Sequence, residues 1–186
     1  MECIVDSREN KILDILKKKE NEFSFSQEYL DLGDFIIRDA NKQEIIFERK
    51  TWSDLHASLQ DSRYREQRSR LLLHAQENPT VKICYLIEGK FNSMYTIEKK
   101  AILRLQFAYH VHVVYSSSLE DTIQLLSLFM HLPHLDCYFN PRNLQIDQVE
   151  ARMSCRTKKN FDDPSIFFQE TLCCLKGMTP VIAYEI

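Results

Sequence analysis

The run Val81–Ile87 (VKICYLI) is the feature that most constrains the fold of this chain. It is apolar at almost every position and stops at Gly89. A strand with one solvated face alternates apolar and polar residues, so a nearly continuous apolar run indicates a strand that is buried on both faces. Such a strand requires helices on both sides of its sheet. We therefore predict an α/β fold built around a buried central strand.

Patterns on both sides of this run supply further strands and helices. Two short apolar runs, Phe35–Ile37 and Glu44–Phe47, flank a polar turn at residues 39–43 and predict an antiparallel hairpin. Later strands alternate with helices, which favours parallel crossovers. We therefore predict a mixed sheet flanked by helices, followed by a short helical C-terminal segment. The other predicted strands are Cys3–Val5, Phe23–Tyr29 and Val111–Tyr115, and the predicted helices are Glu9–Glu20, Trp52–Ala75 with an interruption near Asp61-Ser62, Thr96–Tyr109, Leu119–Leu132 and a segment from Ser165 onward.

The length and charge of the chain limit its domain number and its partners. A chain of 186 residues suffices for one domain with a sizeable core and a small appendage. We predict a domain over residues 1–138, a polar linker over 139–164 and a partial second module over 165–186. The net charge of -3 argues mildly against nucleic acid, because the field of the whole molecule does not attract phosphate. A DNA-binding role would therefore depend on local basic patches.

The sequence contains no apolar stretch long enough to span a membrane. Its six cysteines include no CxxC pair, and Cys3 and Cys84 lie in apolar runs that suit buried thiols. We expect an intracellular protein with no membrane partner. Nucleus, cytosol and viral compartment are not distinguished by these observations.

Three carboxylates, Asp6, Asp34 and Glu48, lie beside predicted strands. Asp6 and Glu48 end apolar runs, and Asp34 opens the first strand of the hairpin. Residues two apart on a strand point to the same face, so Glu48 and Lys50 should project together while Arg49 points away. For a single carboxylate, a strand-end salt bridge is the more common role. A Gly-Asp pair followed one hairpin later by Glu-x-Lys is a more specific pattern.

This arrangement suits the hydrolysis of a phosphodiester. The phosphate is anionic and repels an attacking hydroxide unless a cation offsets its charge. Carboxylate oxygens from Asp34 and Glu48 can hold Mg²⁺ or Mn²⁺, with water and substrate completing the coordination. Such an ion also lowers the pKa of water. Lys50 beside it could orient the attacking water.

Five ordered motifs in this sequence resemble the XPF-type structure-specific endonuclease family. They are Ile4-Val5-Asp6-Ser7-Arg8-Glu9, Gly33-Asp34, Glu48-Arg49-Lys50-Thr51-Trp52-Ser53-Asp54-Leu55, the spaced set Ser58, Asp61, Arg63, Gln67, Arg70 and Leu71, and Tyr85-Leu86-Ile87-Glu88-Gly89. The resemblance implies a restriction-endonuclease-like fold and a divalent-metal nuclease that acts near DNA branch points.

The resemblance also assigns roles to individual residues. It implies that Asp34 and Glu48 are metal ligands and that Lys50 positions water, while Asp6 and Asp54 are ligands or their supports. Arg8 and Arg49 would contact phosphate or orient the carboxylates. The catalytic residues implied in this way are Asp6, Glu9, Asp34, Glu48, Arg49, Lys50 and Asp54.

Further residues are candidates for DNA contact. Arg63, Gln67 and Arg70 share one face of a predicted helix, which could face phosphate or only solvent. Arg65 and Arg68 are expected on a solvent face. At the C-terminal end, Leu175–Ile186 resembles the hairpin and second helix of a helix-hairpin-helix motif, in which Gly177 permits the tight turn. Hairpins of this kind offer backbone N–H groups to DNA phosphate.

The helix Leu119–Leu132 has an apolar surface wider than an ordinary core-facing stripe. Nucleases similar to this chain dimerise through their nuclease domains and hairpin motifs. We therefore expect a homodimer or heterodimer formed through this region.

Competing functions are an inactive scaffold subunit of a nuclease dimer, a nucleic-acid or protein interaction module, and a phosphodiesterase that acts on small nucleotides. The presence of Asp34, Glu48, Arg49 and Lys50 favours an active nuclease, because inactive partners in this family usually lose these residues. The leading hypothesis is that the chain is a metal-dependent endonuclease that cuts branched, forked or flapped DNA.

Overall fold

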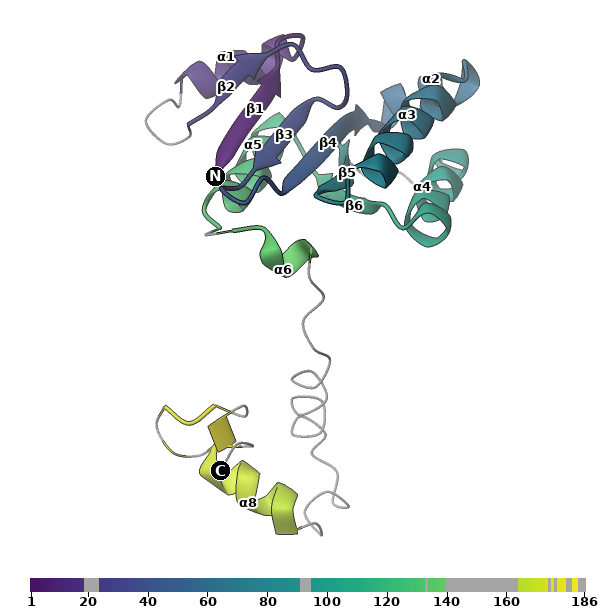
Figure 1. Cartoon of the computed structure of the whole chain (residues 1–186). Helices are drawn as coiled ribbons and strands as arrows, with labels where there is room; N and C mark the ends of the chain where they lie inside the picture. Colours follow the sequence, from purple (N-terminus) through teal and green to yellow (C-terminus); the bar gives the residue numbers. More distant parts are fainter. Residues whose placement is uncertain are drawn as a thin grey trace. The chain divides into compact units, whose positions relative to one another are not determined.

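The computed structural model divides into two units, residues Met1–Phe139 and Asn140–Ile186 (Figure 1). It describes residues 1–18, 24–90, 95–132, 134–139, 164–173, 175, 177–179 and 182–183. Most of the predicted linker, residues 139–164, lies outside the described residues. In the described part, no helix is long and apolar enough to cross a membrane.

The first unit is built on a six-stranded mixed sheet with the strand order β2-β1-β3-β4-β5-β6. The predicted hairpin pairs β3 with β4 antiparallel, and β1 also pairs antiparallel with β3. The pairs β1–β2, β4–β5 and β5–β6 are parallel. The prediction of a mixed sheet is thereby confirmed. The strands are β1 (Glu2–Asp6), β2 (Ser26–Glu28), β3 (Phe35–Arg38), β4 (Glu44–Thr51), β5 (Val81–Glu88) and β6 (His112–Ser116).

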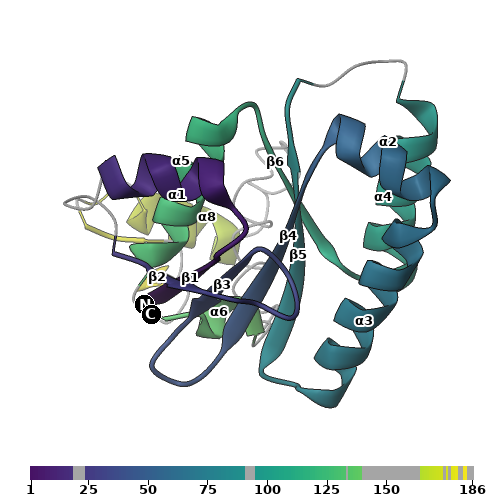
Figure 2. The same cartoon turned by 90° about the horizontal axis from the view of Figure 1, so that it is seen from above.

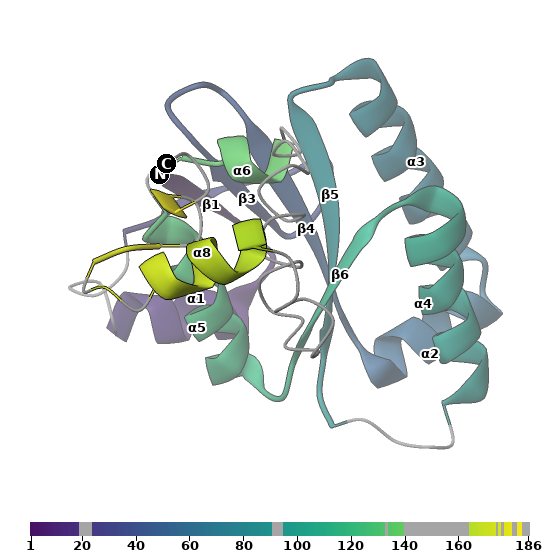
Figure 3. The same cartoon turned by 90° about the horizontal axis from the view of Figure 1, so that it is seen from below.

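Helices cover both faces of this sheet. The helices α1 and α5 lie on one face and α2, α3 and α4 on the other, as the views from above and below agree (Figures 2 and 3). The predicted interruption near Asp61-Ser62 is confirmed, since Asp61 caps α2 and Ser62 has a left-handed φ of 67° before α3. The helices of the first unit are α1 (Asn10–Lys18), α2 (Trp52–Gln60), α3 (Arg63–Glu77), α4 (Thr96–Tyr109), α5 (Leu119–Met130) and α6 (Asp136–Phe139).

Two hydrophobic cores lie on opposite sides of the sheet. Phe47 and Leu86 belong to the core beneath α1 and α5, whereas Ile46 and Tyr85 belong to the core beneath α2, α3 and α4. Adjacent residues of β4 and β5 thus alternate between two buried faces. This explains why the run Val81–Ile87 is almost continuously apolar.

Two expectations from the sequence differ from the structure. Within the predicted half-buried strand Phe23–Tyr29, the described residues form only the short, mostly exposed strand β2. It lies at the edge of the sheet and pairs with β1 alone among the described strands. The broad apolar face of the predicted helix Leu119–Leu132 is mostly used inside the chain. Its central residues Ile123 and Leu126 are buried in the core, and other apolar residues pack partly against it; Leu128 remains exposed. This surface therefore gives little support to an interface between subunits.

The second unit contains the helix α8 (Pro164–Leu172), which the sequence predicts from Ser165 onward. Beyond it, Gly177 has a φ of 87°. The hydroxyl of Thr179 accepts a hydrogen bond from the N–H of Ile182 at 3.4 Å, as a helix-capping side chain does. The proposed helix-hairpin-helix remains a prediction, because several of its residues lie outside the described part.

Gly33 packs directly against β4. Its φ is 74°, and an added Cβ would lie 2.4 Å from Ile46 Cγ2 and 2.9 Å from the carbonyl oxygen of Phe47. This position therefore requires glycine both for its backbone conformation and for space.

We expect Gly33→Ala to lower the free energy of unfolding by about 2–4 kcal/mol, from a strained φ and an overpacked contact. Thermal or urea unfolding measures this change. Gly89→Ala is the matched control: Gly89 has a φ of 108°, but its added Cβ would meet only Trp52 Cδ1, at 3.6 Å. Equal losses in the two variants would show that the contact with β4 is unimportant.

Candidate active site

The backbone positions of the three predicted carboxylates lie side by side at one end of the sheet, because β1, β3 and β4 are neighbouring strands (Figure 2). The backbone N–H of Asp6 donates to the carbonyl of Asp34 at 2.9 Å. The N–H of Asp34 donates in turn to the carbonyl of Phe47 at 2.8 Å, next to Glu48. Backbone pairing therefore aligns the three acidic positions.

Glu48 and Lys50 project to the same side of β4, as strand alternation predicts. Lys50 Nζ donates to Glu48 Oε1 at 3.0 Å and to Gln67 Oε1 at 2.7 Å. Both charged side chains are buried, with 5% and 8% of the residue exposed. Gln67 comes from α3, so this helix fixes the position of the lysine against the strand.

Arg49 lies on the opposite side of β4, where it bridges two glutamates. Its Nε and Nη2 donate to Glu88 at 2.9 and 2.6 Å, and its Nη1 donates to Glu9 at 3.0 Å. Thr122 of α5 also donates to Glu88, at 2.7 Å. Arg49 therefore connects the ends of β4 and β5 with the residues before α1. Arg49 thus points away from Glu48 and Lys50, as strand alternation in the sequence predicted.

The two glutamates that Arg49 bridges respond differently to burial. Burial opposes the ionisation of Glu88, but hydrogen bonds from Arg49 and Thr122 outweigh it, so the pKa of Glu88 is lowered. In Glu9 burial prevails over the attraction of Arg49, and the pKa of that carboxyl is raised. Arg49 thus interacts more strongly with Glu88, to which it donates two hydrogen bonds, than with Glu9, to which it donates one.

Asp6 is fully buried, and its carboxylate is occupied by hydrogen bonds from the protein. It accepts from the backbone N–H, Nε and Nη2 of Arg8 at 2.7, 2.8 and 2.6 Å. It also accepts from the N–H of Leu30 at 3.1 Å. Burial disfavours its charge, but these donors prevail and lower its pKa. The geometry therefore suits an orienting residue that holds Arg8 and the chain before Asp34.

Two other predicted residues lie apart from the three carboxylates. Asp54 is exposed in the first turn of α2, where its Oδ2 accepts from the hydroxyl of Thr51 at 2.6 Å. Arg63 is exposed and pairs with Asp61 at 2.6 Å. Both therefore have local partners at helix ends.

A cavity of about 280 Å³ opens beside Asp34 and Glu48. Arg70 reaches it from α3 and donates to the carbonyl of Asp31 at 3.0 Å. The structure thus brings Asp34, Glu48, Gln67, Arg70 and Arg8 together. The cavity is lined by Arg8, Asp31, Leu32, Gly33, Asp34, Glu48, Gln67, Arg70 and Leu71.

Asp34 carries the most perturbed carboxylate of the cavity. Burial and the nearby charge of Glu48 raise the pKa of Asp34 to about 7, although its Oδ2 accepts a hydrogen bond from the N–H of Arg49 at 2.7 Å. A cation between two repelling carboxylates would relieve both effects.

The donor set fits a hard divalent ion. In the described part of the chain, Asp34 Oδ1 and Glu48 Oε2 have no hydrogen-bond partner. Mg²⁺ keeps several waters and is commonly held by one or two carboxylates. No group of three or more His, Cys, Asp or Glu side chains suited to a metal occurs among the described residues. A two-carboxylate site is therefore the arrangement that this geometry can offer.

The sequence of residues 5–129 matches the ERCC4 domain family. This chain belongs to the ERCC4 domain family. The matched segment contains every predicted catalytic residue and ends within α5. The resemblance to XPF-type structure-specific endonucleases is thereby confirmed at the level of the family.

Individual relatives agree with this assignment. The chain is 38% identical over 100 residues, 48% of its length, to the probable crossover junction endonuclease mus81 of Dictyostelium discoideum, and the match spans 10% of that protein. Two solved structures of XPF from Aeropyrum pernix, one in complex with DNA, each superpose with a TM-score of 0.56. They are 24% and 22% identical, cover 99% and 100% of this chain, and are themselves covered to 94% and 95%. This ERCC4 domain therefore has the predicted restriction-endonuclease-like fold.

Two residues of this ERCC4 domain have positions that the sequence analysis missed. Glu88, the principal partner of Arg49, ends the central strand, and its polar side chain after an apolar run was the available signal. Tyr85 is paired in register with Glu48 and is fully buried. Its hydroxyl has no hydrogen-bond partner among the described residues. A tyrosine within an apolar strand gives no indication in the sequence that it lies beside Glu48.

The raised pKa of Asp34 predicts that its charge destabilises the metal-free domain. Folding raises this pKa from 3.8 to about 7. The folded chain therefore keeps a proton that the unfolded chain releases, and stability falls as pH rises through that window. We expect Asp34→Asn to raise the melting temperature at pH 8 by several degrees, since one pKa unit is about 1.4 kcal/mol. The gain should vanish near pH 4.

Thermal unfolding with a chelator present measures this difference. Asp31→Asn is the matched control, since it removes the same charge from an exposed position three residues away. A gain for Asp34→Asn that does not change with pH would contradict the electrostatic explanation.

Proposed function

We propose that this ERCC4 domain is the catalytic part of a divalent-metal-dependent endonuclease that hydrolyses phosphodiester bonds of branched, forked or flapped DNA. The observation that carries the proposal is the shared cavity of Asp34 and Glu48, with Lys50 held against Glu48 at 3.0 Å. The names of the relatives support it, since one is a probable crossover junction endonuclease and another was solved in complex with DNA.

Each side chain of the cavity has a distinct part in this proposal. Asp34 and Glu48 would hold Mg²⁺ or Mn²⁺ through their free oxygens. When bound, the ion supplies positive charge that acidifies water and offsets the charge of the phosphate. Lys50 Nζ, fixed between Glu48 and Gln67, would donate a hydrogen bond to the attacking water and orient it. The lysine also limits the repulsion between Glu48 and an incoming phosphate.

The cations at the rim would hold the substrate. Arg70 and Arg8 line the cavity, and both are anchored to backbone carbonyls, of Asp31 and Leu30 respectively. Their remaining N–H groups would contact phosphates next to the bond that is cut. Arg49, Glu9 and Asp6 would support the carboxylates from behind, through the pairs already described. The backbone around Gly177 would bind phosphate farther along the DNA.

The nuclease proposal predicts that Lys50→Ala loses turnover and keeps DNA affinity. Removal of one positioned electrostatic group typically costs on the order of a hundredfold or more in rate. A nicking assay on flap, fork and linear duplex DNA, with and without Mg²⁺, measures the loss, and fluorescence anisotropy measures the affinity. Lys42→Ala is the control, because Lys42 is exposed in the hairpin turn.

Three results would count against the nuclease proposal. They are full activity of Lys50→Ala, cutting without a divalent ion, and faster hydrolysis of small nucleotides than of DNA. An unmodified chain that binds branched DNA but never cuts it would instead support an inactive scaffold subunit.

We further propose that the chain works as a homodimer or heterodimer. Exposed apolar side chains on α4 support this, since Phe107 and Leu103 are 76% and 52% exposed one helical turn apart. We expect sedimentation equilibrium to give twice the mass of one chain, and Leu103→Glu with Phe107→Glu to give a single chain. A monomer at high concentration, with no partner subunit that restores association, would contradict it.

A further inference from the structure

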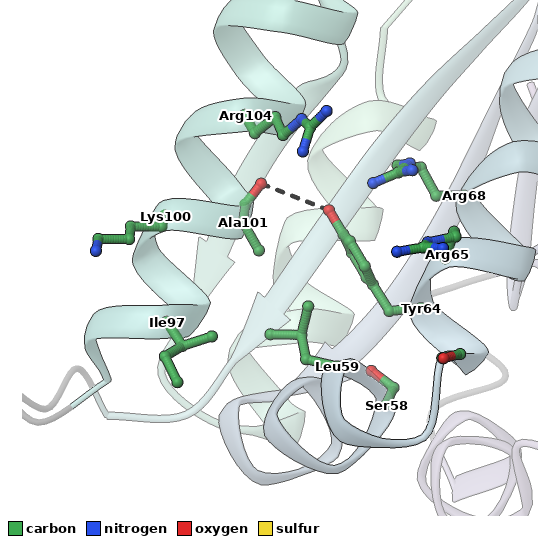
Figure 4. Close-up of a pocket in the computed structure, with 10 residues that line it drawn as sticks. Ser58, Leu59, Tyr64, Arg65, Arg68, Ile97, Lys100, Ala101 and Arg104 are labelled. Carbon is green, nitrogen blue, oxygen red and sulfur yellow. Dashed lines mark hydrogen bonds between the residues drawn. The ribbon is translucent and has the colours of Figure 1, made fainter.

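The helix α3 lines a second cavity, on the side away from the catalytic one. This cavity has a volume of about 430 Å³ and lies between α3, the end of α2 and α4 (Figure 4). Arg65 and Arg68 reach it from α3, and Lys100 and Arg104 from α4. The sequence analysis expected Arg65 and Arg68 on a solvent face. This was wrong for Arg68, which is half-buried because α4 forms the opposite wall.

The charge of this cavity is not balanced by the protein. Its lining contains no aspartate or glutamate. Within the described part of the chain, none of its four cations forms an ion pair, whereas Arg8, Arg38, Arg49 and Arg63 are each paired with a carboxylate. Four unpaired cations around one cavity repel one another, and an anion would relieve that repulsion.

Arg68 and Arg104 are held in place by aromatic rings. The guanidinium of Arg68 lies 5.3 Å from the ring centroid of Tyr64 and 4.6 Å from that of Tyr109, and Arg104 lies 5.6 Å from Tyr109. The hydroxyl of Tyr64 donates to the carbonyl of Ala101 at 3.5 Å, which ties α3 to α4 (Figure 4). Stacking fixes a guanidinium and leaves its N–H groups available.

The polar groups of this cavity are only partly satisfied by the protein. The Nε of Arg68 is enclosed by the protein and has no hydrogen-bond partner among the described residues. A buried donor without a partner costs about 1–3 kcal/mol. The side chain of Ser62 precedes α3 but makes no capping hydrogen bond with it. The cavity thus combines fixed cations with free donors, as a phosphate site requires.

The position of the cavity points to the phosphate backbone of DNA. Gln67 and Arg70 flank the buried residues Tyr64 and Leu71 of α3 on the catalytic side, and Arg65 and Arg68 flank them on the other. The two cavities therefore flank α3, about one helix diameter apart, roughly 10–12 Å. A DNA backbone that crosses α3 would place phosphates at both cavities.

We propose that the cavity between α3 and α4 binds a backbone phosphate of the DNA, on the other flank of α3 from the phosphate at the catalytic cavity. The proposal rests on the proposed function in one respect, that DNA occupies the catalytic cavity. It adds a second contact that fixes the path of the duplex across α3. It also explains how a chain with a net charge of -3 can attract DNA locally.

The test removes three of the four charges of the cavity and keeps Arg68 with its contacts to Tyr64 and Tyr109. The variant carries Arg65→Gln, Lys100→Gln and Arg104→Gln, and keeps Arg68. The matched control carries Lys11→Gln, Lys17→Gln and Lys18→Gln, which remove the same charge from exposed positions of α1 on the other face of the sheet. Both are made in the full chain with Asp34→Asn, so that DNA is bound and not cut. Equal melting temperatures verify that the variants fold.

Affinity for duplex and forked DNA is then measured across about 50–200 mM salt. We expect the cavity variant to lower the slope of log affinity against log salt by about one, the value for one phosphate contact, and the control to leave the slope unchanged. Inorganic phosphate, titrated into labelled protein and followed by NMR, should shift the amides of Arg65 and Arg104 saturably, and not in the cavity variant.

The outcomes separate this proposal from the proposed function. Equal slopes in the cavity variant and the control would overturn the DNA contact. A saturable phosphate shift with an unchanged DNA slope would also overturn it, and would indicate an anion from another source, such as an acidic protein segment. A lowered slope in the cavity variant, together with an unmodified chain that does not cut DNA in the presence of Mg²⁺, would sustain this contact and defeat the nuclease assignment.

Discussion

The hydrogen bond from the backbone N–H of Arg49 to Asp34 Oδ2, 2.7 Å long, joins the two halves of the candidate site. It fixes the carboxylate that precedes β3 against the end of β4. The segment Glu48-Arg49-Lys50 then serves both faces of the sheet, because successive residues of a strand point in opposite directions. Glu48 and Lys50 face α3 and the cavity, while Arg49 ties the strand to Glu88 and Glu9 on the other face. The backbone N–H of Arg49 thus positions Asp34 at the cavity, while its side chain anchors the same strand end on the other face of the sheet.

The carboxylates of the site differ in how well hydrogen bonds and nearby charges stabilise their ionised forms. Asp6 receives four hydrogen bonds and Glu88 receives Arg49 and Thr122, so both carboxylates are stabilised as anions. Asp34 receives one backbone N–H and faces Glu48, so its charge is opposed. The well-paired carboxylates hold the structure together, and the poorly paired one is at the cavity. Ionisable groups with strongly perturbed pKa values are common at functional sites, and Asp34 at the cavity follows this pattern.

Much of this arrangement could be predicted from the sequence, because it depends on periodicity and order along the chain. The run Val81–Ile87 predicted a strand buried on both faces, and Glu-x-Lys predicted that Glu48 and Lys50 share a face. What could not be predicted depends on neighbours distant in sequence. Phe23–Tyr29 has an alternating pattern, but its position at the sheet edge leaves a strand of three residues. Arg68 has the spacing of an exposed residue, and only α4, about thirty residues later, makes it half-buried.

The rotation of α3 about its own axis connects the two cavities. Tyr64 and Leu71 are buried in the core, and that burial fixes which residues appear on either flank. Gln67 and Arg68 are adjacent in the chain. Gln67 accepts a hydrogen bond from Lys50 beside the candidate active site, whereas Arg68 lines the basic cavity. A helix rotates as a rigid body, so a core substitution that turned α3 would move both residues together. The geometry of the candidate active site and the placement of the basic cavity therefore depend on the same buried contacts of α3.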